Sequence, residues 1–496
     1  MKEINDYSIA EKLSFFSPMV IVVSFVFVLV AVMTFPEIMM EFSEKTSDFD
    51  GYVIAGSVSV MLALIGFTVA GKSRVTISTR QLYLMTTSSW CAFALMGAIP
   101  LYINLPGLSF ADAFFESMSG ITTTGSTVLT GLDRMPHSIL LWRALLQWVG
   151  GIGIIVLGIA ILPYLKIGGM RLFATESSHL SGSTRPSAQN LLKNIGLVYI
   201  LLTVAASSVY WFAGMNLFDA ITHAMTTVST GGYSNYDASM GHFSSQPAIL
   251  WTATVFMLLG ALPFALYVSL LSGRSSQLFK DAQVRGFIVF VVSIAVLLSW
   301  ERTVNGDSST LHAVTHSAFN AISIITTTGY VSDDYTRWGY YAEVAFFYMM
   351  FIGGCSGSTS GSIKFFRLQI AMVLLLNQLH IMRHPNAQYV NKYNGRHVTE
   401  DILRSIIGFS FFFMLTIIIV AFGLSLTGLD FVTSMSAATT CVTNVGPGLG
   451  DIVGPAGNFS SLSDSAKWLL ASGMLFGRLE IMTVLVLLTP AFWQRF

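Results

Sequence analysis

The sequence predicts an all-helical membrane protein made of four tandem repeats, each with a span, a short helix and a second span, preceded by two further spans. Three observations predict this fold. The chain is too apolar for a soluble protein, and it contains apolar runs long enough to cross a bilayer. A Thr/Ser/Gly-rich turn also recurs four times at intervals of about 100 residues, which indicates internal repetition.

Composition excludes a soluble domain. Of the 496 residues, 53% are hydrophobic and only 10% are charged, and the mean hydropathy is +0.67. A soluble domain carries about 25% charged residues, because charge has to cover its water-facing surface. The net charge of zero gives no indication of a nucleic-acid partner. Cys91, Cys355 and Cys441 are widely spaced, and we interpret them as buried thiols, not as a disulfide framework or a metal site.

Ten segments are candidates for membrane spans. A helix of about 20 apolar residues crosses the hydrocarbon core. The candidates lie at roughly 18–36, 52–71, 82–104, 138–163, 194–214, 246–271, 285–300, 341–382, 403–426 and 466–490. The first apolar run is too long for a cleavable signal peptide. The run at 285–300 is short, and the run at 341–382 is interrupted at 353–362.

The connections between spans alternate in charge. The segments 72–80, 166–193, 274–285 and 364–404 hold sixteen Lys and Arg, whereas the alternate connections hold six. Loops rich in Lys and Arg stay in the cytoplasm. We therefore expect these four segments and both termini to be cytoplasmic.

Four connections on the opposite side share one pattern. They align without gaps on four glycines, which are Gly125, Gly232, Gly329 and Gly446. One residue earlier stand Thr124, Gly231, Thr328 and Val445. Two residues earlier stand Thr123, Thr230, Thr327 and Asn444. The hydroxyl-bearing residues three positions earlier are Thr122, Ser229, Thr326 and Thr443.

The same alignment extends toward the N-terminal side of each turn. The residues four before the glycine are apolar and β-branched, namely Ile121, Val228, Ile325 and Val442. The residues thirteen before it are polar, namely Asp112, Asp219, His316 and Thr433. A polar residue is typical of a helix start. The pattern therefore predicts a half-length helix that leads into each glycine turn.

These four turns favour a cation pore. Irregular backbone is tolerated at membrane depth only where protein buries it or where it lines a water-filled cavity. Four turns around one axis could replace the hydration shell of a cation with carbonyl oxygens, and each half-helix directs its partly negative C-terminal end to the centre. None of the turns carries a carboxylate, which favours a monovalent ion. A single turn of this kind is weak evidence, because such turns commonly connect helices, but four in one register favour a filter.

At these residues the sequence resembles the Trk/Ktr/HKT superfamily of potassium transporters, in particular its bacterial Trk-type membrane subunits of the TrkH/TrkG type. The resemblance covers nearly the whole chain. Its most specific segments are SGITTTGST, TTVSTGGYSNYD, SIITTTGYVSDDY, TNVGPGLG, FIGGCSGSTSGSIKFFR and MLFGRLEIMTVLVLLTP.

The resemblance implies four linked span–pore helix–span units in pseudo-fourfold symmetry around one pore. It further implies K⁺ as the transported ion (with Rb⁺ also accepted), a bacterial inner-membrane location, a homodimer, and a cytosolic nucleotide-binding regulatory ring of the TrkA type. A serine at the first filter position accompanies sodium permeability in some plant relatives. Because the chain keeps Gly125, potassium selectivity is expected.

Together, the repeats and the resemblance divide the chain into five parts. The two extra spans occupy residues 1–75, and the four pore repeats occupy 76–180, 181–275, 276–390 and 391–496.

A gating loop is expected in the third repeat. Its residues are Gly353, Gly354, Cys355, Ser356, Gly357, Ser358, Thr359, Ser360 and Gly361. Glycine costs about 1 kcal/mol per helix position relative to alanine, so this segment is a poor helix. One interpretation is close helix packing, because three glycines are spaced four apart. The other is a flexible plug under the filter, which the resemblance supports, with Lys364 and Arg367 near the cytoplasmic face.

Arg478 lies within the last predicted span. A charge at membrane depth is expensive and rarely faces lipid. It could form a structural pair with a carboxylate, although Glu480, two residues away, would face elsewhere on a helix. Alternatively, it places a positive charge beside the pore below the filter, where the resemblance puts an arginine. His223 and His316 are interpreted as hydrogen-bonded structural residues of the pore helices.

Two other function classes were weighed. Broken helices and repeats also occur in transporters that couple two ions, but those repeats are usually inverted or form two halves, whereas these four share one orientation. A membrane enzyme is disfavoured, because the sequence shows no metal-ligand cluster, nucleophile elbow or P-loop.

Overall fold

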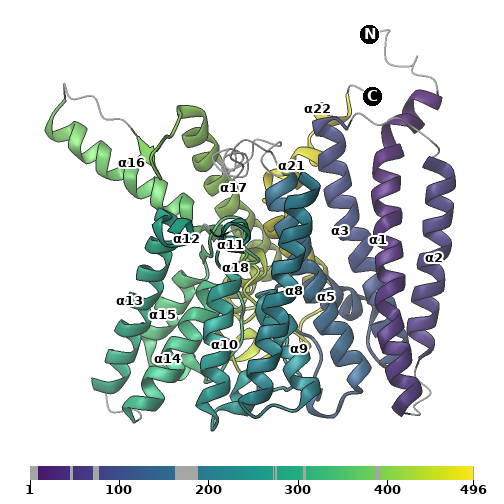
Figure 1. The fold of residues 1–496 in the computed structure, drawn as a ribbon, viewed down its shortest axis with the longest axis horizontal. Helices are drawn as coiled ribbons and strands as arrows, with labels where there is room; N and C mark the ends of the chain where they lie inside the picture. Colours follow the sequence, from purple (N-terminus) through teal and green to yellow (C-terminus); the bar gives the residue numbers. More distant parts are fainter. Residues whose placement is uncertain are drawn as a thin grey trace.

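The computed structural model describes residues 9–44, 49–70, 77–161, 188–271, 273, 276–304, 309–385 and 391–494. Within these residues the chain is a helical bundle with two small sheets of two strands each. The N-terminal pair of helices comprises α1 (Ile9–Glu44) and α2 (Asp50–Ala70), which form one edge of the molecule (Figure 1). The start of α1 and the final helix α22 (Pro490–Trp493) lie at the same end (Figure 1).

The remaining elements follow a recurring order of long helix, short helix, irregular loop and second helix. The first set comprises α3 (Thr79–Asn104), α4 (Phe110–Ile121), η1 (Leu132–Arg134), α5 (His137–Val156) and η2 (Leu157–Ile161). The second comprises α8 (Ala188–Phe212), α9 (Leu217–Val228), η3 (Ser239–Phe243), α10 (Pro247–Gly260), α11 (Phe264–Leu271) and α12 (Ser276–Lys280). The order therefore matches the span–short helix–span pattern expected from the sequence.

The third and fourth sets contain the two sheets. The third comprises α13 (Ala282–Val304), α14 (Thr310–Ile325), η4 (Tyr335–Trp338), α15 (Tyr340–Met349), β1 (Ile352–Gly353), β2 (Ile363–Lys364) and α16 (Phe365–Arg383). The fourth comprises β3 (Lys392–Tyr393), β4 (Arg396–His397), α17 (Glu400–Ser425), α18 (Phe431–Thr443), α19 (Gly450–Val453), α20 (Asp464–Arg478), α21 (Met482–Leu488) and α22. Strands β1 and β2 are parallel, with Ile352 opposite Ile363, whereas β3 and β4 are antiparallel.

Eight helices among the described residues are long and apolar enough to cross a membrane, and two bent pairs raise the number to ten. The expected spans 246–271 and 466–490 each correspond to a pair of helices joined by a bend. Helices α10 and α11 bend by 92°, and α20 and α21 bend by 117°. Pro263 lies at the first bend, where its missing N–H and its ring prevent a straight helix. Basic segments 72–76 and 166–187 lie outside the described residues, as do both termini and most of the repeat boundaries.

The short helices start earlier than the sequence predicted. Side chains cap three of them: Ser109 accepts from the N–H of Asp112, Asn216 from that of Asp219, and Asp430 from that of Thr433. The cap lies three residues before the expected start in α4, α9 and α18, and α14 begins after Ser309. The polar residue thirteen before the glycine is therefore the third residue of the helix in α4, α9 and α18, and in α4 its carboxylate completes a capping box by accepting from the N–H of Ser109.

Glycines let the second helix of three sets approach the end of the short helix. A Cβ atom on Gly150 of α5 would overlap the carbonyl oxygen of Ile121, and one on Gly477 of α20 would overlap that of Val442. On Gly260 of α10, it would lie 2.9 Å from the carbonyl oxygen of Val228. In each case the contacted residue is the β-branched one four before the aligned glycine. This contact fixes each short helix against its own second helix.

We predict that Gly150→Ala destabilises the protein, because the added methyl group meets backbone that cannot move aside. Gly153→Ala is the matched control in the same helix, since its nearest new neighbour, Trp90, lies 3.7 Å away and alanine favours a helix by about 1 kcal/mol over glycine. Thermal unfolding in detergent should show a lower midpoint for Gly150→Ala and an unchanged or higher midpoint for Gly153→Ala. Equal midpoints would contradict the packing argument.

Candidate ion pathway

The four short helices α4, α9, α14 and α18 end in the same backbone turn. The N–H two residues before the aligned glycine bonds to the carbonyl three residues earlier, and the next N–H bonds to the carbonyl five residues earlier. The first bond joins Thr123 to Gly120, Thr230 to Thr227, Thr327 to Ile324 and Asn444 to Cys441, at 2.9–3.3 Å. The second joins Thr124 to Ser119, Gly231 to Thr226, Thr328 to Ser323 and Val445 to Thr440, at 2.8–3.0 Å. This is the Schellman ending of a helix.

A Schellman ending needs a left-handed residue, which here is the one two before the glycine. Its φ is 49° at Thr123, 49° at Thr230, 58° at Thr327 and 57° at Asn444. Glycine or asparagine usually takes this position, and a β-branched residue there is an outlier. Such strain costs of order 1–3 kcal/mol per residue and persists where the surrounding structure enforces it. Three of the four loops are therefore strained at the same place.

The aligned glycines are also left-handed. Their φ values are 86° at Gly125, 79° at Gly232, 79° at Gly329 and 111° at Gly446. The residue between the two left-handed positions does not have a positive φ in any of the four loops. This alternation lets successive carbonyl groups turn the same way, which glycine permits because it has no Cβ.

The four loops form a closed ring of contacts. A Cβ atom added to any of the aligned glycines would come within 3.0 Å of a carbonyl oxygen from the next loop. The pairs are Gly125 with Gly231, Gly232 with Thr328, Gly329 with Val445, and Gly446 with Thr124. Each partner stands one residue before the next glycine, so the order runs through loops 1, 2, 3 and 4 and returns to 1. The structure thus brings all four predicted turns together.

The hydroxyl groups three before the glycine bond back to their own helices. Thr122, Thr326 and Thr443 donate to the carbonyl four residues earlier, at 2.6–2.8 Å. Ser229 donates to the carbonyl of Thr226 at 3.2 Å. Their role in the structure is therefore to satisfy the C-terminal carbonyls of the short helices.

One cavity lies on the side of the ring that the chain enters after each aligned glycine. It has a volume of about 550 Å³, and all four aligned glycines line it. Asp237 and Asp451 also line it. Negative charge at the mouth of a cleft raises the local concentration of cations. The cavity therefore has the shape and charge of an entrance for cations.

The segment 353–362 lies on the other side of the ring. Thr230 donates its hydroxyl to that of Thr359 at 3.0 Å, and the N–H of Gly361 donates to the hydroxyl of Thr327 at 2.6 Å. A Cβ atom on Gly361 would lie 2.7 Å from the carbonyl oxygen of Thr443. The left-handed threonines of loops 2 and 3 thus point their side chains at this segment. The closely packed helix that was one interpretation of these glycines is not present, because strands β1 and β2 bracket an irregular loop.

This loop also completes the broken helix of the second set. The bend between α10 and α11 leaves the carbonyl of Ala261 and the N–H of Phe264 without helical partners. Cys355 donates its N–H to Ala261 at 2.9 Å, and Gly357 accepts from Phe264 at 3.0 Å. The hydroxyl of Thr359 donates to the carbonyl of Gly260 at 2.9 Å. The loop is therefore anchored by hydrogen bonds on two sides.

Arg478 ends α20 beside the loop and is 3% exposed. Its Nη2 donates to the carbonyl of Thr359 at 2.9 Å, while its Nε and Nη1 have no hydrogen-bond partner among the described residues. The alternative of a pair with Glu480 is not supported, because Glu480 pairs with Arg367 at 2.6 Å. A small cavity of about 20 Å³ is lined by Arg478, Lys364 and Glu480, together with Ser360 and other loop residues. Lys364 and Arg367 are buried beside the loop.

The two histidines are hydrogen-bonded, as expected. His223 contacts the backbone carbonyl of Asp219 at 2.9 Å and the hydroxyl of Ser234 at 3.1 Å. His316 contacts the hydroxyl of Ser332 at 2.9 Å. Cys91, Cys355 and Cys441 are free thiols in the structure.

Sequence reasoning missed Gln147, which is fully buried on α5. Its Nε2 donates to the carbonyl of Gly231 at 2.6 Å, and its Oε1 accepts from the N–H of Tyr233 at 3.0 Å. Any side chain on Gly231 would overlap Gln147, which explains why the second loop has glycine where the first and third have threonine. A polar residue inside the apolar run 138–163 was the available signal.

Comparison with known proteins agrees with this geometry. The TrkH family model, described as a cation transport protein, matches residues 52–495. The Trk system potassium uptake protein TrkI of Halomonas elongata is 48% identical over 451 residues, covering 90% of this chain and 92% of the relative. TrkH of Escherichia coli K12 is 40% identical over 430 residues, covering 85% and 88%.

A solved structure shows the same fold. The crystal structure of the potassium transporter TrkH from Vibrio parahaemolyticus superimposes with a TM-score of 0.88 at 33% identity, covering 96% of this chain and 99% of that chain. The family match spans most of the sequence, and the fold match spans nearly all of the structure. The chain therefore belongs to the TrkH family of cation transport proteins and is a membrane transport protein, not an enzyme.

Proposed function

We propose that this chain is the membrane subunit of a Trk-type potassium uptake system, through which dehydrated K⁺ passes a single gated pore. The observation that carries the proposal is the closed ring of four loops, in which each aligned glycine meets a carbonyl oxygen of the next loop. A ring of carbonyl oxygens can replace the hydration shell of a cation. The filter comprises the sixteen residues at 122–125, 229–232, 326–329 and 443–446.

The carbonyl oxygens that the ring offers as ligands favour a monovalent ion. They are neutral backbone groups, and the nearby acidic residues Asp237 and Asp451 lie in the outer cavity and not in the ring. Divalent Ca²⁺ prefers carboxylate oxygens, and Mg²⁺ retains its water. We infer K⁺ over Na⁺ from the four glycines and from the similarity to potassium uptake proteins of Trk systems.

The segment 353–361 and Arg478 form the proposed gate. The loop contacts the side chains of Thr230 and Thr327 on the side of the ring opposite the outer cavity. In this conformation it therefore occupies the exit from the ring. The buried guanidinium of Arg478 adds a positive charge, which repels a cation strongly where the surroundings are apolar. Conduction therefore requires the loop to move.

A transporter that couples potassium to protons or sodium is the second candidate. The cyclic contacts favour a pore, because four loops of one orientation surround one axis. Current recordings separate the two: a pore gives a reversal potential that follows the potassium gradient alone, whereas coupling gives a fixed stoichiometry with a second ion.

We also propose the surroundings of the chain. On the resemblance to Trk-type membrane subunits, we place it in the bacterial inner membrane as a homodimer that works with a cytosolic nucleotide-binding regulatory ring of the TrkA type. The division into an N-terminal pair of spans and four repeats, at 1–75, 76–180, 181–275, 276–390 and 391–496, belongs to this proposal. Light scattering of the purified protein tests the dimer, and a monomeric mass would contradict it.

The direct test of function is ion flux into liposomes that hold the purified protein. We expect K⁺ and Rb⁺ to enter and Na⁺ to enter much more slowly. Equal K⁺ and Na⁺ flux would overturn the proposed selectivity, and the absence of flux for any of the three ions in a folded protein would overturn the pore.

We predict that Gly232→Ser reduces K⁺ selectivity, because its side chain would overlap the carbonyl of Thr328 in the ring. Gly107→Ser is the matched control. Gly107 has a φ of 92°, so serine is strained there too, but no atom lies within 4 Å of the new Cβ. The relative Na⁺ and K⁺ fluxes should change only in Gly232→Ser, and an equal change in both variants would show that backbone strain alone is responsible.

We predict that Arg478→Ala increases K⁺ flux, because it removes the positive charge and the hydrogen bond to Thr359. Arg478→Lys keeps the charge and should remain nearer to the wild type. Unchanged flux in Arg478→Ala would count against a barrier at this residue.

We predict that Thr359→Val raises basal flux as well, because valine keeps the shape of threonine but cannot bond to Gly260 or Thr230. Ser358→Ala is the control in the same loop, since among the described residues the hydroxyl of Ser358 bonds only to the carbonyl of Cys355. Flux assays on both variants decide whether the contacts of Thr359 hold the loop closed. Equal flux in the two variants would mean that they do not.

A further inference from the structure

A second position recurs in the register of the repeats, nine residues before the aligned glycine. The residues there are Glu116, His223, Asn320 and Ala437. In the first three repeats the side chain contacts the irregular segment that follows the glycine. It therefore connects the short helix to the outer part of the same filter loop, on the side of the 550 Å³ cavity.

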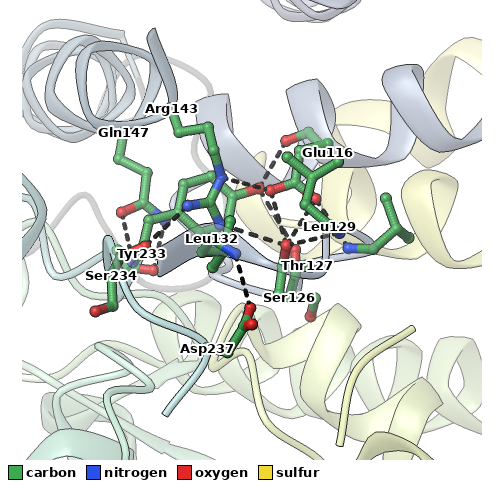
Figure 2. A network of polar contacts seen from close by, with 12 residues as sticks. Glu116, Ser126, Thr127, Leu129, Leu132, Arg143, Gln147, Tyr233, Ser234 and Asp237 are labelled. Carbon is green, nitrogen blue, oxygen red and sulfur yellow. Dashed lines mark hydrogen bonds and ion pairs between the residues drawn. The ribbon is translucent and has the colours of Figure 1, made fainter. Parts of the chain in front are cut away.

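In the first repeat this connection is an ion pair. Glu116 and Arg143 converge on Thr127 (Figure 2), with Arg143 Nε 2.8 Å from Glu116 Oε1. The carboxylate accepts from the hydroxyl of Thr127 at 3.0 Å and from the N–H of Val128 at 2.9 Å. Both charged side chains are at most 2% exposed. Arg143 Nη1 also donates to the carbonyl of Ser234 at 2.9 Å, so the pair joins loop 1 to loop 2.

In the second and third repeats the connection is neutral. His223 Nε2 contacts the hydroxyl of Ser234, two residues after the glycine, at 3.1 Å. Asn320 Oδ1 accepts from the N–H of Ser332, three residues after the glycine, at 3.1 Å. Ser332 in repeat 3 and Val128 in repeat 1 both stand three residues after the aligned glycine, so the two backbone partners are equivalent.

The backbone carbonyl at this position is used too. Tyr233, directly after the second glycine, donates its hydroxyl to the carbonyl of Glu116 at 2.7 Å. Tyr330, directly after the third glycine, donates to the carbonyl of His223 at 3.2 Å. Each tyrosine therefore fastens its own loop to the short helix of the preceding repeat.

The fourth repeat lacks both connections. Ala437 has no polar side chain, and Pro447 stands where the tyrosines stand in repeats 2 and 3. Among the described residues, this short helix makes one hydrogen bond to the segment after its glycine, from the hydroxyl of Ser436 to the carbonyl of Leu449 at 3.2 Å. Three quarters of the ring are thus fastened at this position, and one is not.

We propose that the residue nine before the filter glycine is a positioning residue for ion selectivity in the first three repeats, with Glu116 the strongest because its ion pair ties two loops together. This proposal rests on the proposed function of the ring as a K⁺ filter. In the snug-fit account of selectivity, the carbonyl oxygens have to hold their positions when a smaller ion enters. A side chain that belongs to the short helix and bonds to the segment after the glycine resists that movement. A well-packed ion pair with several hydrogen bonds resists it most.

The experiment separates the brace from the charge. Removing one partner of a buried pair leaves an unpaired charge, so both variants replace Arg143 with leucine, which carries no charge. Glu116→Asn with Arg143→Leu installs the neutral brace of repeat 3, and Glu116→Ala with Arg143→Leu removes the brace. The two proteins then differ only in the amide group.

We expect the alanine double variant to conduct K⁺ with a Na⁺-to-K⁺ permeability ratio about tenfold higher than the asparagine double variant, a change equivalent to about 1.4 kcal/mol. The asparagine variant should stay near the wild-type ratio. Monodisperse elution and a cooperative melt establish that each protein is folded. A folded alanine variant that conducts K⁺ with an unchanged ratio overturns the positioning role, whereas wild-type protein that does not conduct K⁺ overturns the proposed function instead.

A second pair of variants covers the case in which the double variants fail to fold. Asn320→Ala removes a neutral brace from repeat 3 without exposing a charge. Ser317→Ala is its control on the same helix, because the buried hydroxyl of Ser317 has no hydrogen-bond partner among the described residues. The permeability ratio should rise in Asn320→Ala alone, and an unchanged ratio there overturns the proposal.

Discussion

The structure depends on one constraint, which is that backbone groups released by a broken helix need partners inside the protein. At membrane depth no water is available, and each unsatisfied group costs several kcal/mol. The bend at Pro263 frees the carbonyl of Ala261 and the N–H of Phe264, and both find partners in the loop of the third repeat. The break in one repeat is therefore stabilised by the break in the next, and neither would be stable alone.

The same constraint connects the filter to the loop beneath it. A left-handed threonine is strained, yet this conformation directs the hydroxyl groups of Thr230 and Thr327 to Thr359 and Gly361. The contacts offset part of the strain, so the ring and the loop support each other's conformation. Movement of the loop would remove these partners from the threonines. The two elements are thus physically coupled, because the same hydrogen bonds contribute to both.

The sequence predicted those features that repeat, and the structure confirms that the aligned glycines meet in one ring. The short helices were predicted from the shared spacing, but their starts were misplaced by three residues. Asp112 and Asp219 are the third residues of their helices, and the side chains that cap these helices belong to Ser109 and Asn216. The bend at Pro263 was missed although a proline was present, since the apolar run around it reads as continuous. The pairing of Arg367 with Glu480 could not be predicted, because it joins residues 113 positions apart.

Apart from His223, which was interpreted as a hydrogen-bonded structural residue, the brace residues escaped sequence reasoning for a different reason. Glu116, His223, Asn320 and Ala437 share a position but no chemistry, so alignment by residue type does not reveal them. Their common feature is a position on the short helix opposite the segment that follows the glycine, and only the fold shows this. The register found from the glycines nevertheless identifies the position once one brace is known.

Linking four repeats in one chain has a physical consequence for the proposed pore. Each quarter of the ring can differ, and here the ion pair of Glu116 belongs to repeat 1, the loop at 353–361 to repeat 3 and Arg478 to repeat 4. A ring of four identical subunits would repeat each feature four times. Four guanidinium groups below the ring would repel one another strongly in apolar surroundings, and four loops would compete for the space below the ring that one loop fills. The proposed single gate and single charge therefore require repeats that are similar in backbone and unequal in side chains.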